Sequence, residues 1–469
     1  MGLKMTLSPP LNFLIGVGDF PTILATTTEA TLEAEADGAT VLGGVLLSLV
    51  VIYLASKLGG EIFARLNLPP VLGDLVGGVV VGVSVFNLIV FPETGAEATD
   101  SLVFRFIQAT SDITPETLAA SFHAESEVIS VLSELGVIIL LFEIGLESEL
   151  GELLKYGPQA AIVAVVGVAA PFAMGTAGLM TIFHVAAIPA IFAGAALTAT
   201  SIGITAKVLA EINKLSSKEG QIIIGAAVLD DVLGIIVLAV VASLVKTGEV
   251  QVTGILYLTV SAGVFLIGSI LLGRLLAPYF IALVKELKTR GPLLIASLIV
   301  VFVFSYVAAA IQLESILGAF AAGLILGETE KQHEIEEQVI PVADMLVPVF
   351  FVVVGARTDL AVLNPAVPSN REGLIIATFL IVVAIVGKVI TGYTIFGQPD
   401  TNKLAIGVGM IPRGEVGLVF AAVGSASGAL SEALEAAIVV MVIITTFLAP
   451  PLLRVVLERG AKPVEEVQS

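Results

Sequence analysis

The stretch GAAVLDDVLGIIVLAVV (residues 225–241) places two adjacent carboxylates, Asp230 and Asp231, in a run that is otherwise apolar. Apolar runs dominate the chain: 57% of its 469 residues are hydrophobic, 13% are charged, and the mean hydropathy is +1.04. About a quarter of the residues of a soluble protein are charged. A chain this apolar can cover its surface only in lipid, as helices of about 20 residues, so its composition excludes a secreted or cytosolic enzyme.

Charge and residue counts narrow the function further. The net charge is −19 and only 22 residues are Lys or Arg, so no nucleic-acid partner is expected, because phosphate binding needs a basic patch. The chain has no Cys and three His, which excludes a thiolate metal site and argues against zinc chemistry. No Gly-rich phosphate loop follows a strand pattern, which argues against an ATP-driven pump. We expect neither an enzyme nor a bound cofactor.

The apolar runs predict thirteen membrane-spanning segments. The seventh is unusually long and the ninth is short. The segments are 39–58, 71–90, 128–147, 158–183, 187–212, 219–245, 252–287, 291–311, 314–327, 338–357, 373–396, 403–424 and 431–456. The expected fold class is therefore an all-α polytopic membrane protein with about 13 transmembrane helices.

Three stretches fall outside these segments. Residues 1–38 form an amino-terminal extension, in which the apolar residues 11–25 are either a signal peptide or an extra helix; the acidic residues around them favour a surface or extra helix. Residues 91–127 carry many Asp and Glu and are expected to form a polar extramembrane loop. Residues 457–469 form a short tail.

The distribution of Lys and Arg between the two sides predicts the orientation. Three basic residues, Lys207, Lys388 and Arg413, fall inside segments. The amino-terminal side carries five, and the opposite side carries the other fourteen of the 22. Those five are Lys4, Arg105, Lys246, Arg357 and Arg371. We therefore expect the amino terminus outside and the carboxyl terminus in the cytoplasm, most simply in the plasma (inner) membrane.

The chain also resembles itself. VLGDLVGGVVVG (71–82) in segment two and ILGAFAAGLILG (316–327) in segment nine share three glycines at equal spacing. LLFEIGLESEL (140–150) in segment three and FFVVVGARTDL (350–360) in segment ten share a Gly and the final Leu. Both pairs are seven segments apart, an odd number, so equivalent helices must enter the membrane from opposite faces. This inverted repeat is typical of secondary transporters, whose substrate site lies near the midplane.

Charged side chains inside segments mark candidate functional residues, because each costs about 2.5–3.5 kcal/mol at the centre of a lone spanning helix. Asp230 and Asp231 are adjacent and therefore about 100° apart around a helix, so both cannot point at one place. One of them would pair with Lys388, which lies in the middle of segment eleven. The other would line a cavity where proton and cation binding compete, as an antiporter requires. A purely structural role for both aspartates is the alternative.

Two segments show the composition of broken helices. TATSIGIT (198–205) includes Thr200 and Ser201 among four hydroxyl residues, and IPRGEVG (411–417) places Arg413 and Glu415 beside Pro and Gly. Unwound backbone at membrane depth is tolerated where it lines a cavity or is buried in protein, and it offers carbonyl groups to a cation. The hydroxyls could instead bond back to carbonyls of their own helix. The two segments are again seven apart, which favours the functional interpretation.

Four motifs carry a family resemblance. TATSIGITAKVLAE (198–211), GAAVLDDVLGIIVLA (225–239), IVGKVITGY (385–393) and GMIPRGEVGLVFA (409–421) resemble the sodium/proton antiporters of NapA type. These belong to the monovalent cation:proton antiporter group that includes the Kef potassium efflux systems. The resemblance covers most of the membrane portion, with the motifs in the family's order.

This resemblance implies a homodimer of thirteen-helix protomers with two crossing broken helices and an elevator movement. Helices four to six (158–245) and eleven to thirteen (373–456) would form a mobile core. Helices one to three (39–147) and eight to ten (291–357) would form a dimerisation panel, with helix seven (252–287) as the linker.

The resemblance also implies roles for single residues. Asp231 would bind cation or proton in turn, and Asp230 would pair with Lys388. Thr200 and Ser201 would lie in the first broken helix near the ion and belong, with the two aspartates, to the ion-binding residues. Arg413 and Glu415 would be charges at the crossing of the two broken helices. The paired aspartates with the lysine resemble the electrogenic class. The expected cargo is Na⁺, with Li⁺ possible, in exchange for H⁺.

Other functions stay open at this stage. A Kef-like K⁺/H⁺ antiporter is disfavoured, because about a dozen residues follow segment thirteen and leave no room for a regulatory nucleotide-binding domain. A sodium-coupled organic-anion symporter would share the inverted repeat but take a bulky substrate. A sensor that binds cation without transport is a third possibility. Neither of the last two explains two aspartates with a buried lysine as simply.

Overall fold

The structure is a computed structural model that describes residues 36–247, 252–286, 288–366, 368–398 and 400–460. The predictions for residues 11–25, and for most of the 1–38 extension and of the 457–469 tail, lie outside the described residues. The described part consists of helices joined by turns, without a strand.

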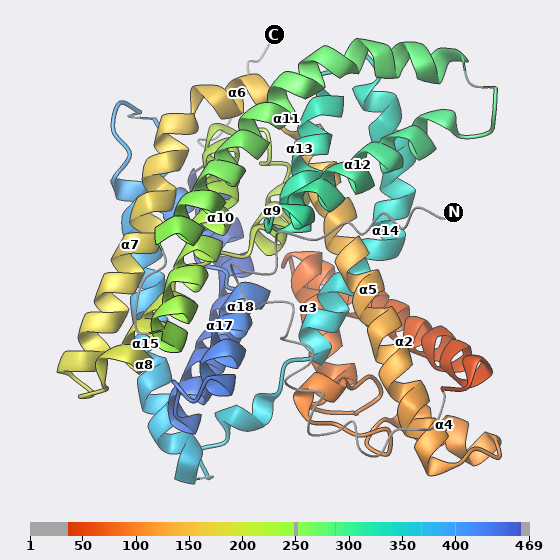
Figure 1. Cartoon of the computed structure of the whole chain (residues 1–469), viewed down its shortest axis with the longest axis vertical. Coiled ribbons are helices and arrows are strands. Elements are labelled where there is room, and N and C mark those ends of the chain that lie inside the picture. Colours follow the sequence, from red (N-terminus) through yellow and green to blue (C-terminus); the bar gives the residue numbers. More distant parts are fainter. Residues whose placement is uncertain (1–35, 248–251, 287, 367, 399, 461–469) are drawn as a thin grey trace, which may run out of the picture.

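The helices follow one another along the whole described chain (Figure 1). Two short 3₁₀ helices, Pro92–Thr94 and Leu360–Leu363, lie between them. The α-helices are α2 (Gly38–Arg65), α3 (Pro70–Val81), α4 (Leu102–Thr110), α5 (Pro115–Glu147), α6 (Leu150–Lys155), α7 (Gly157–Thr181), α8 (Ala187–Ala196), α9 (Ile202–Glu211), α10 (Lys218–Thr247), α11 (Val252–Glu286), α12 (Pro292–Ala310), α13 (Ser315–Gly327), α14 (Gln332–Ala356), α15 (Pro368–Tyr393), α16 (Lys403–Gly409), α17 (Glu415–Ala426) and α18 (Glu432–Gly460).

In the described part, 9 helices are long and apolar enough to cross a membrane. They are α2, α5, α7, α10, α11, α12, α14, α15 and α18. The other predicted segments correspond to the short helices α3 and α13 and to two interrupted helices, α8–α9 and α16–α17. Each of the thirteen predicted segments therefore has a helical counterpart.

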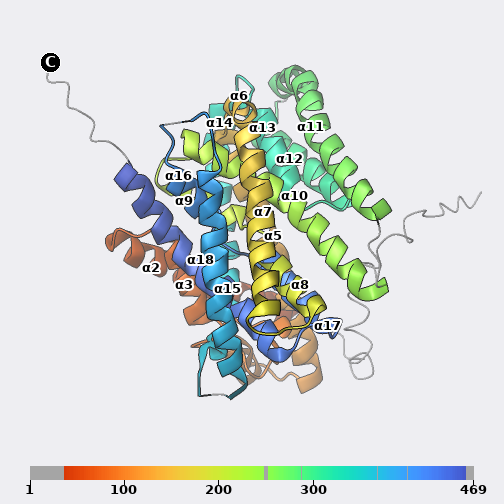
Figure 2. The ribbon, with the colours of Figure 1, turned by 90° about the vertical axis from the view of Figure 1, so that its left-hand side faces the viewer.

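The helices form two groups (Figures 1 and 2). One group, on the left of Figure 1, contains α7, α8, α10, α15, α17 and α18. The other contains α2, α3, α5, α12, α13 and α14. Helix α11 follows α10 in the chain and packs on α12 and α13, so it connects the two groups.

Within the second group, helices cross where glycines let their backbones touch. A Cβ on Gly78 of α3 would lie 2.8 Å from Cα of Gly355 of α14. A Cβ on Gly145 of α5 would lie 2.9 Å from Cα of Gly323 of α13. The internal sequence match pairs Gly78 with Gly323 and Gly145 with Gly355, so each contact is the repeat equivalent of the other.

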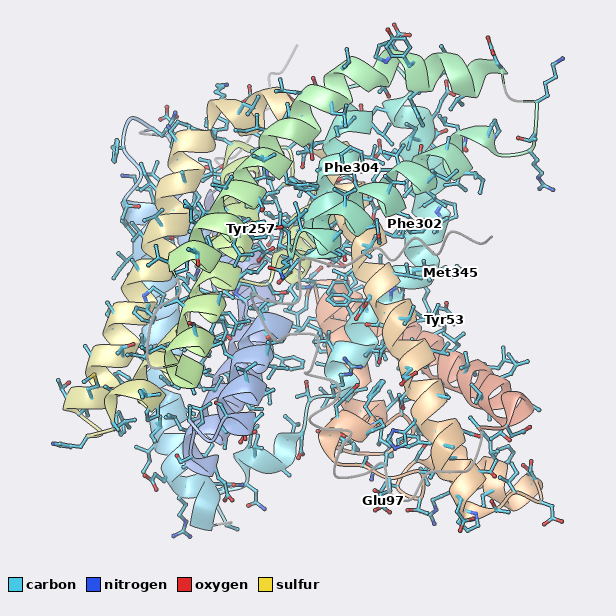
Figure 3. The ribbon with its side chains drawn as sticks, in the orientation of Figure 1. Tyr53, Glu97, Tyr257, Phe302, Phe304 and Met345 are labelled. Carbon is cyan, nitrogen blue, oxygen red and sulfur yellow. The ribbon has the colours of Figure 1, made fainter. Side chains whose placement is uncertain are left out.

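Two further contacts tie the outer helices of this group to its centre. The hydroxyl of Tyr53 in α2 donates to the carbonyl of Met345 in α14 at 2.9 Å, and the two residues lie side by side in Figure 3. A Cβ on Gly318 of α13 would lie 2.3 Å from the carbonyl oxygen of Phe304 in α12, so these two backbones are in contact.

Two predicted boundaries were wrong. The second segment was expected to be helical over 71–90, but α3 ends at Val81. The next residues form an irregular loop that ends in the buried residues Ile89 and Val90. Its N–H groups bond to the end of α3, as from Ile89 to the carbonyl of Val81 at 3.0 Å, and Asn87 lies in the left-handed region at φ 51°. Hydropathy does not distinguish such a loop from a helix.

The region 91–127, expected to be a polar loop, is largely helical instead. It contains α4 and the first turns of α5, which begins at Pro115 rather than near residue 128. Thr114 caps α5, since its Oγ1 accepts from the N–H of Thr117 at 3.3 Å. A hydroxyl cap followed by Pro at the first helical position is a helix-start signal, and it outweighs the polarity of this stretch.

Candidate functional site

The two interrupted helices of the first group meet at their breaks. The first break, 197–201, separates α8 from α9, and the second, 410–414, separates α16 from α17. The N–H of Ser201 donates to the carbonyl of Pro412 at 2.9 Å. A break in a helix leaves backbone N–H and C=O groups without helical hydrogen-bond partners. Here a carbonyl group of the second break accepts a hydrogen bond from an N–H group of the first.

Threonine side chains extend this contact. The hydroxyl of Thr200 donates to the carbonyl of Met410 at 3.2 Å, and that of Thr205 donates to the carbonyl of Gly409 at 2.8 Å. Thr198 behaves differently, because its hydroxyl donates within its own helix, to the carbonyl of Ala195 at 2.7 Å. The local interpretation of the TATSIGIT hydroxyls therefore holds for Thr198, whereas Thr200 and Thr205 join the two breaks.

Arg413 lies within the second break and is completely buried. Its Nη1 donates to the carbonyl of Met410 at 3.2 Å and lies 3.5 Å from Oγ1 of Thr200. Its Nε and Nη2 have no hydrogen-bond partner among the described residues. Its own carbonyl accepts from the hydroxyl of Thr446 in α18. Glu415 begins α17 directly after this break.

A buried ion pair lies in the same group of helices. Nζ of Lys388 in α15 lies 3.1 Å and 3.2 Å from the two carboxylate oxygens of Asp230 in α10. Both side chains are fully buried, at 0% exposure. A buried pair of this kind is costly to break, because removing one partner leaves the other charge uncompensated. Asp231, 3% exposed, follows Asp230 and is directed elsewhere around α10, since adjacent helical residues differ by about 100°.

These residues form one electrostatic neighbourhood. Lys388 has Coulombic interactions with Asp230, Asp231 and Arg413. Arg413 has a further Coulombic interaction with Asp230. The structure thus brings together two carboxylates, two cations and the hydroxyl and carbonyl oxygens of the breaks. Among the described residues there is no group of three His, Cys, Asp or Glu that could hold a metal ion. Carboxylate, hydroxyl and carbonyl oxygens are the ligands that hard cations prefer.

A separate polar contact joins the two helix groups. Oε1 of Glu211, the last residue of α9, accepts from the N–H of Val71 at the start of α3 at 3.1 Å. Helix α3 has no side-chain cap of its own, so this carboxylate satisfies one of its free N–H groups. Beside the contact is a cavity of about 150 Å³. It is lined by Pro69, Pro70, Glu211, Ile212, Lys214, Arg454, Leu457 and Glu458.

Sequence reasoning missed two of these contacts. Thr446 is one of two adjacent threonines in an apolar segment, the same signal that marked TATSIGIT, and could have been found. Glu211 sits at a segment end, where a charge is ordinary, and the sequence does not show that α3 lies opposite it.

The chain matches a known family over almost its whole length. Residues 20–459 match the family described as "Sodium/hydrogen exchanger, transmembrane". A protein of Synechocystis sp., named high-affinity Na⁺/H⁺ antiporter NhaS3, is 69% identical over 443 residues, which cover 94% of this chain and 95% of that protein. The Na⁺/H⁺-K⁺ antiporter GerN of Bacillus cereus is 33% identical over 411 residues, covering 87% of this chain and 94% of GerN.

The fold also has a solved counterpart. The structure of the sodium proton antiporter MjNhaP1 from Methanocaldococcus jannaschii superposes with a TM-score of 0.57. The match covers 90% of this chain and 98% of that chain at 15% identity, so it shows a shared fold.

Proposed function

The chain belongs to the sodium/hydrogen exchanger family, and on that premise we propose that it exchanges sodium ions for protons across the membrane. It is a multi-pass integral membrane transporter rather than an enzyme. The observation that carries the proposal is the buried Asp230–Lys388 pair next to Asp231, beside the crossing of two broken helices.

Asp231 is the residue that binds cation or proton in turn. Moving the negative charge of a carboxylate through the low-dielectric interior costs several kcal/mol. Asp231 therefore crosses only when a proton or a cation neutralises it, and strict exchange follows. Thr200 and Ser201 supply oxygens near the cation, and Asp230 contributes to the same cation site while it pairs with Lys388.

The charges at the crossing balance the ends of the half-helices. The carbonyl ends of α8 and α16 carry partial negative charge, and the amide ends of α9 and α17 carry partial positive charge. Arg413 donates to the carbonyl of Met410 at the end of α16, and Glu415 stands at the amide end of α17. This arrangement is the one expected for these two signs of charge.

The two helix groups have different parts in transport. The group containing α7–α10 and α15–α18 is the mobile core, and the glycine-packed group is the panel through which two protomers form a homodimer. Helix α11 is the linker. The core moves as an elevator against the panel and carries the ion site from one side to the other. These assignments rest on the packing of the groups and on the family resemblance.

The protein lies in the plasma (inner) membrane. Its amino terminus is outside the cell and its carboxyl terminus is in the cytoplasm, as the distribution of Lys and Arg predicts. Na⁺ is the expected cation and Li⁺ a second substrate, with electrogenic exchange. K⁺ is the alternative cargo, because a relative 33% identical to this chain is named a Na⁺/H⁺-K⁺ antiporter.

The test is proton flux in proteoliposomes with an imposed pH gradient, with Na⁺, Li⁺ and K⁺ added in turn. Wild-type protein should exchange Na⁺, and Asp231→Asn should abolish exchange, because a neutral amide binds neither cargo as a carboxylate does. Asp344→Asn, at an exposed carboxylate of α14, is the matched control and should keep wild-type flux. Residual exchange in Asp231→Asn would remove that residue from its role, and no flux with any cation would overturn the proposed function.

A further inference from the structure

The ammonium group of Lys388 touches a second helix besides the one that carries Asp230. On α7, an added Cβ at Gly167 would lie 3.1 Å from Nζ of Lys388 and 3.6 Å from its Cδ. The first distance is tighter than nine in ten real Cβ contacts, so the ammonium would have to move by a few tenths of an ångström. Lys388 is fully buried and held at both oxygens of Asp230, so it has little freedom to retreat. Residue 167 must therefore be glycine for the ammonium to keep its present place.

The same turn of α7 contains a proline. Pro171 lies inside the helix and is buried. Residue 171 would ordinarily donate its N–H to the carbonyl of residue 167, but proline has no N–H. The carbonyl of Gly167 therefore lacks its usual helical donor, at the one residue whose missing side chain makes room for Lys388.

Proline 171 also packs beside the lysine's own helix. A Cβ on Gly387, the residue before Lys388, would lie 3.0 Å from Cβ of Pro171. The turn 167–171 of α7 thus contacts α15 at two successive residues, Gly387 and Lys388. The glycine, the proline and the lysine form one local unit.

We propose that the turn 167–171 of α7 is a positioning element for Lys388. Gly167 provides the space for the ammonium, and Pro171 packs against Gly387, the residue before Lys388, and so holds α15 against this turn. An ammonium has three donors, and the carboxylate of Asp230 is their observed acceptor. The close packing of α7 against the ammonium limits the positions from which Lys388 can approach Asp230. This inference rests on the proposed function, in which the Asp230–Lys388 pair sets how the site exchanges protons and cations.

The inference predicts an effect on the ion site rather than on folding alone. The charged groups that act on Lys388 are Asp230 and Asp231 of α10 and Arg413 of the second break. Displacing the ammonium by a few tenths of an ångström changes its interaction with all three. The pH dependence of exchange and the apparent KM for sodium are therefore the quantities that should move.

The experiment measures sodium/proton exchange in proteoliposomes across a range of pH for wild type, Gly167→Ala and Pro171→Ala. Gly167→Ala should change the apparent KM for sodium by about threefold or more and shift the pH of half-maximal exchange. Pro171→Ala removes the ring that packs on Gly387, so the turn holds α15 less tightly and the profile should shift by less than with Gly167→Ala. Its melting temperature should equal or exceed the wild type, because alanine suits a helix interior better than proline.

Two control variants match these changes away from the lysine. Gly225→Ala in α10 adds a Cβ that would lie 3.2 Å from Ala160, a similar crowding without a charged neighbour. Pro341→Ala removes an exposed interior proline of α14. Both should keep the wild-type KM and pH profile. Equal shifts in the controls, or wild-type behaviour of both α7 variants, would overturn the inference.

A double-mutant comparison separates the positioning role from general packing. In a Lys388→Gln background the ammonium is gone, so adding Gly167→Ala should have little further effect on the binding of sodium, measured as the rise in melting temperature that sodium produces. This readout does not require transport. An undiminished effect of Gly167→Ala in that background contradicts the inference. An unchanged pH profile in Lys388→Gln alone would instead refute the role of the ion pair in the proposed function.

Discussion

The fold contains two kinds of helix crossing, one formed by backbone contacts at glycines and the other by side-chain hydrogen bonds. In the group with α3, α5, α13 and α14, the helices cross at glycines, and backbone touches backbone at Gly78–Gly355 and Gly145–Gly323. In the group with the broken helices, the crossing is made by hydroxyl–carbonyl bonds between the breaks. The polar crossing joins segments five and twelve, which are seven apart, whereas the glycine crossings join segment two to ten and segment three to nine and are repeat equivalents of each other.

This difference in construction gives the two crossings different properties. A glycine crossing leaves no space between the backbones, so it can hold no ion or charge and resists relative movement. The polar crossing keeps Arg413 and a set of freed carbonyls in the interior, beside the pair of Lys388 and Asp230. One repeat architecture thus supplies a stiff support and a site where buried charge is available.

We expect the largest loss of stability from a substitution that adds a side chain at a glycine crossing. Gly145→Ala would place a Cβ 2.5 Å from the carbonyl oxygen of Phe320, which belongs to a backbone that cannot rotate away. Overpacking of this kind costs about 1–3 kcal/mol and occasionally more. We expect a lower melting temperature in detergent, with loss of exchange only in proportion to the protein that unfolds.

Gly43→Ala in α2 is the control for this substitution, because nothing lies within 4 Å of the added Cβ. It should leave the melting temperature unchanged or raise it slightly, since alanine favours a helix. If Gly145→Ala were as stable as Gly43→Ala, the crossing would be looser than its backbone distances indicate.

A smaller effect is expected at the polar crossing. Thr205→Val keeps the shape of the side chain but removes the hydroxyl that donates to the carbonyl of Gly409. A neutral hydrogen bond contributes about 1 kcal/mol, and the buried carbonyl that is left adds to the loss. We expect modest destabilisation together with a higher apparent KM for sodium, because the breaks that border the ion site are less well held.

Thr198→Val tests whether this effect belongs to the crossing. Both threonines are fully buried near the same break, but the hydroxyl of Thr198 bonds only to the carbonyl of Ala195 in its own helix. Its substitution should affect stability and leave the KM near wild type. Identical KM values for the two variants would show that the bonds between the breaks do not shape the site.

Many residues of the two kinds of crossing could be predicted from the sequence, for a physical reason. A carboxylate, a lysine or a cluster of hydroxyls inside an apolar run is costly unless it has partners, so its presence is informative. That argument pointed to Asp230, Asp231, Lys388 and both breaks. The glycine spacing that suggested the repeat is the spacing of the close contacts, since only glycine permits them.

The sequence did not reveal which side chains and backbone groups lie in contact between helices. Thr200 and Thr205 join the breaks while Thr198 does not, and the three look alike in sequence. Gly167 and Pro171 are ordinary in a transmembrane helix until α15 is known to lie beside them. The error at 71–90 has the same origin, because an apolar run that folds as a loop satisfies N–H groups through contacts that hydropathy does not encode.

The smallest effect should arise where the two helix groups meet, at the bond from the N–H of Val71 to Glu211. This contact joins α9 to α3, and the proposed elevator movement of one helix group against the other would break it. Glu211→Ala removes the acceptor and should favour the conformation in which the groups have moved apart. The chain has no Cys, so a single Leu457→Cys in the adjacent cavity gives a unique thiol for maleimide labelling. We expect labelling to be about twofold to tenfold faster with Glu211→Ala than without it.

Glu458→Ala provides the matched comparison on the same Leu457→Cys background. Glu458 lines the same cavity, but its ion pair at 2.7 Å is with Arg454 of its own helix, so losing it frees nothing between the groups. Its labelling rate should stay at the starting value. Equal acceleration by both variants would mean that cavity charge, rather than a bond between core and panel, controls access. Acceleration by Glu211→Ala alone would place a breakable polar contact at the boundary between the glycine-packed support and the helices that carry the ion site.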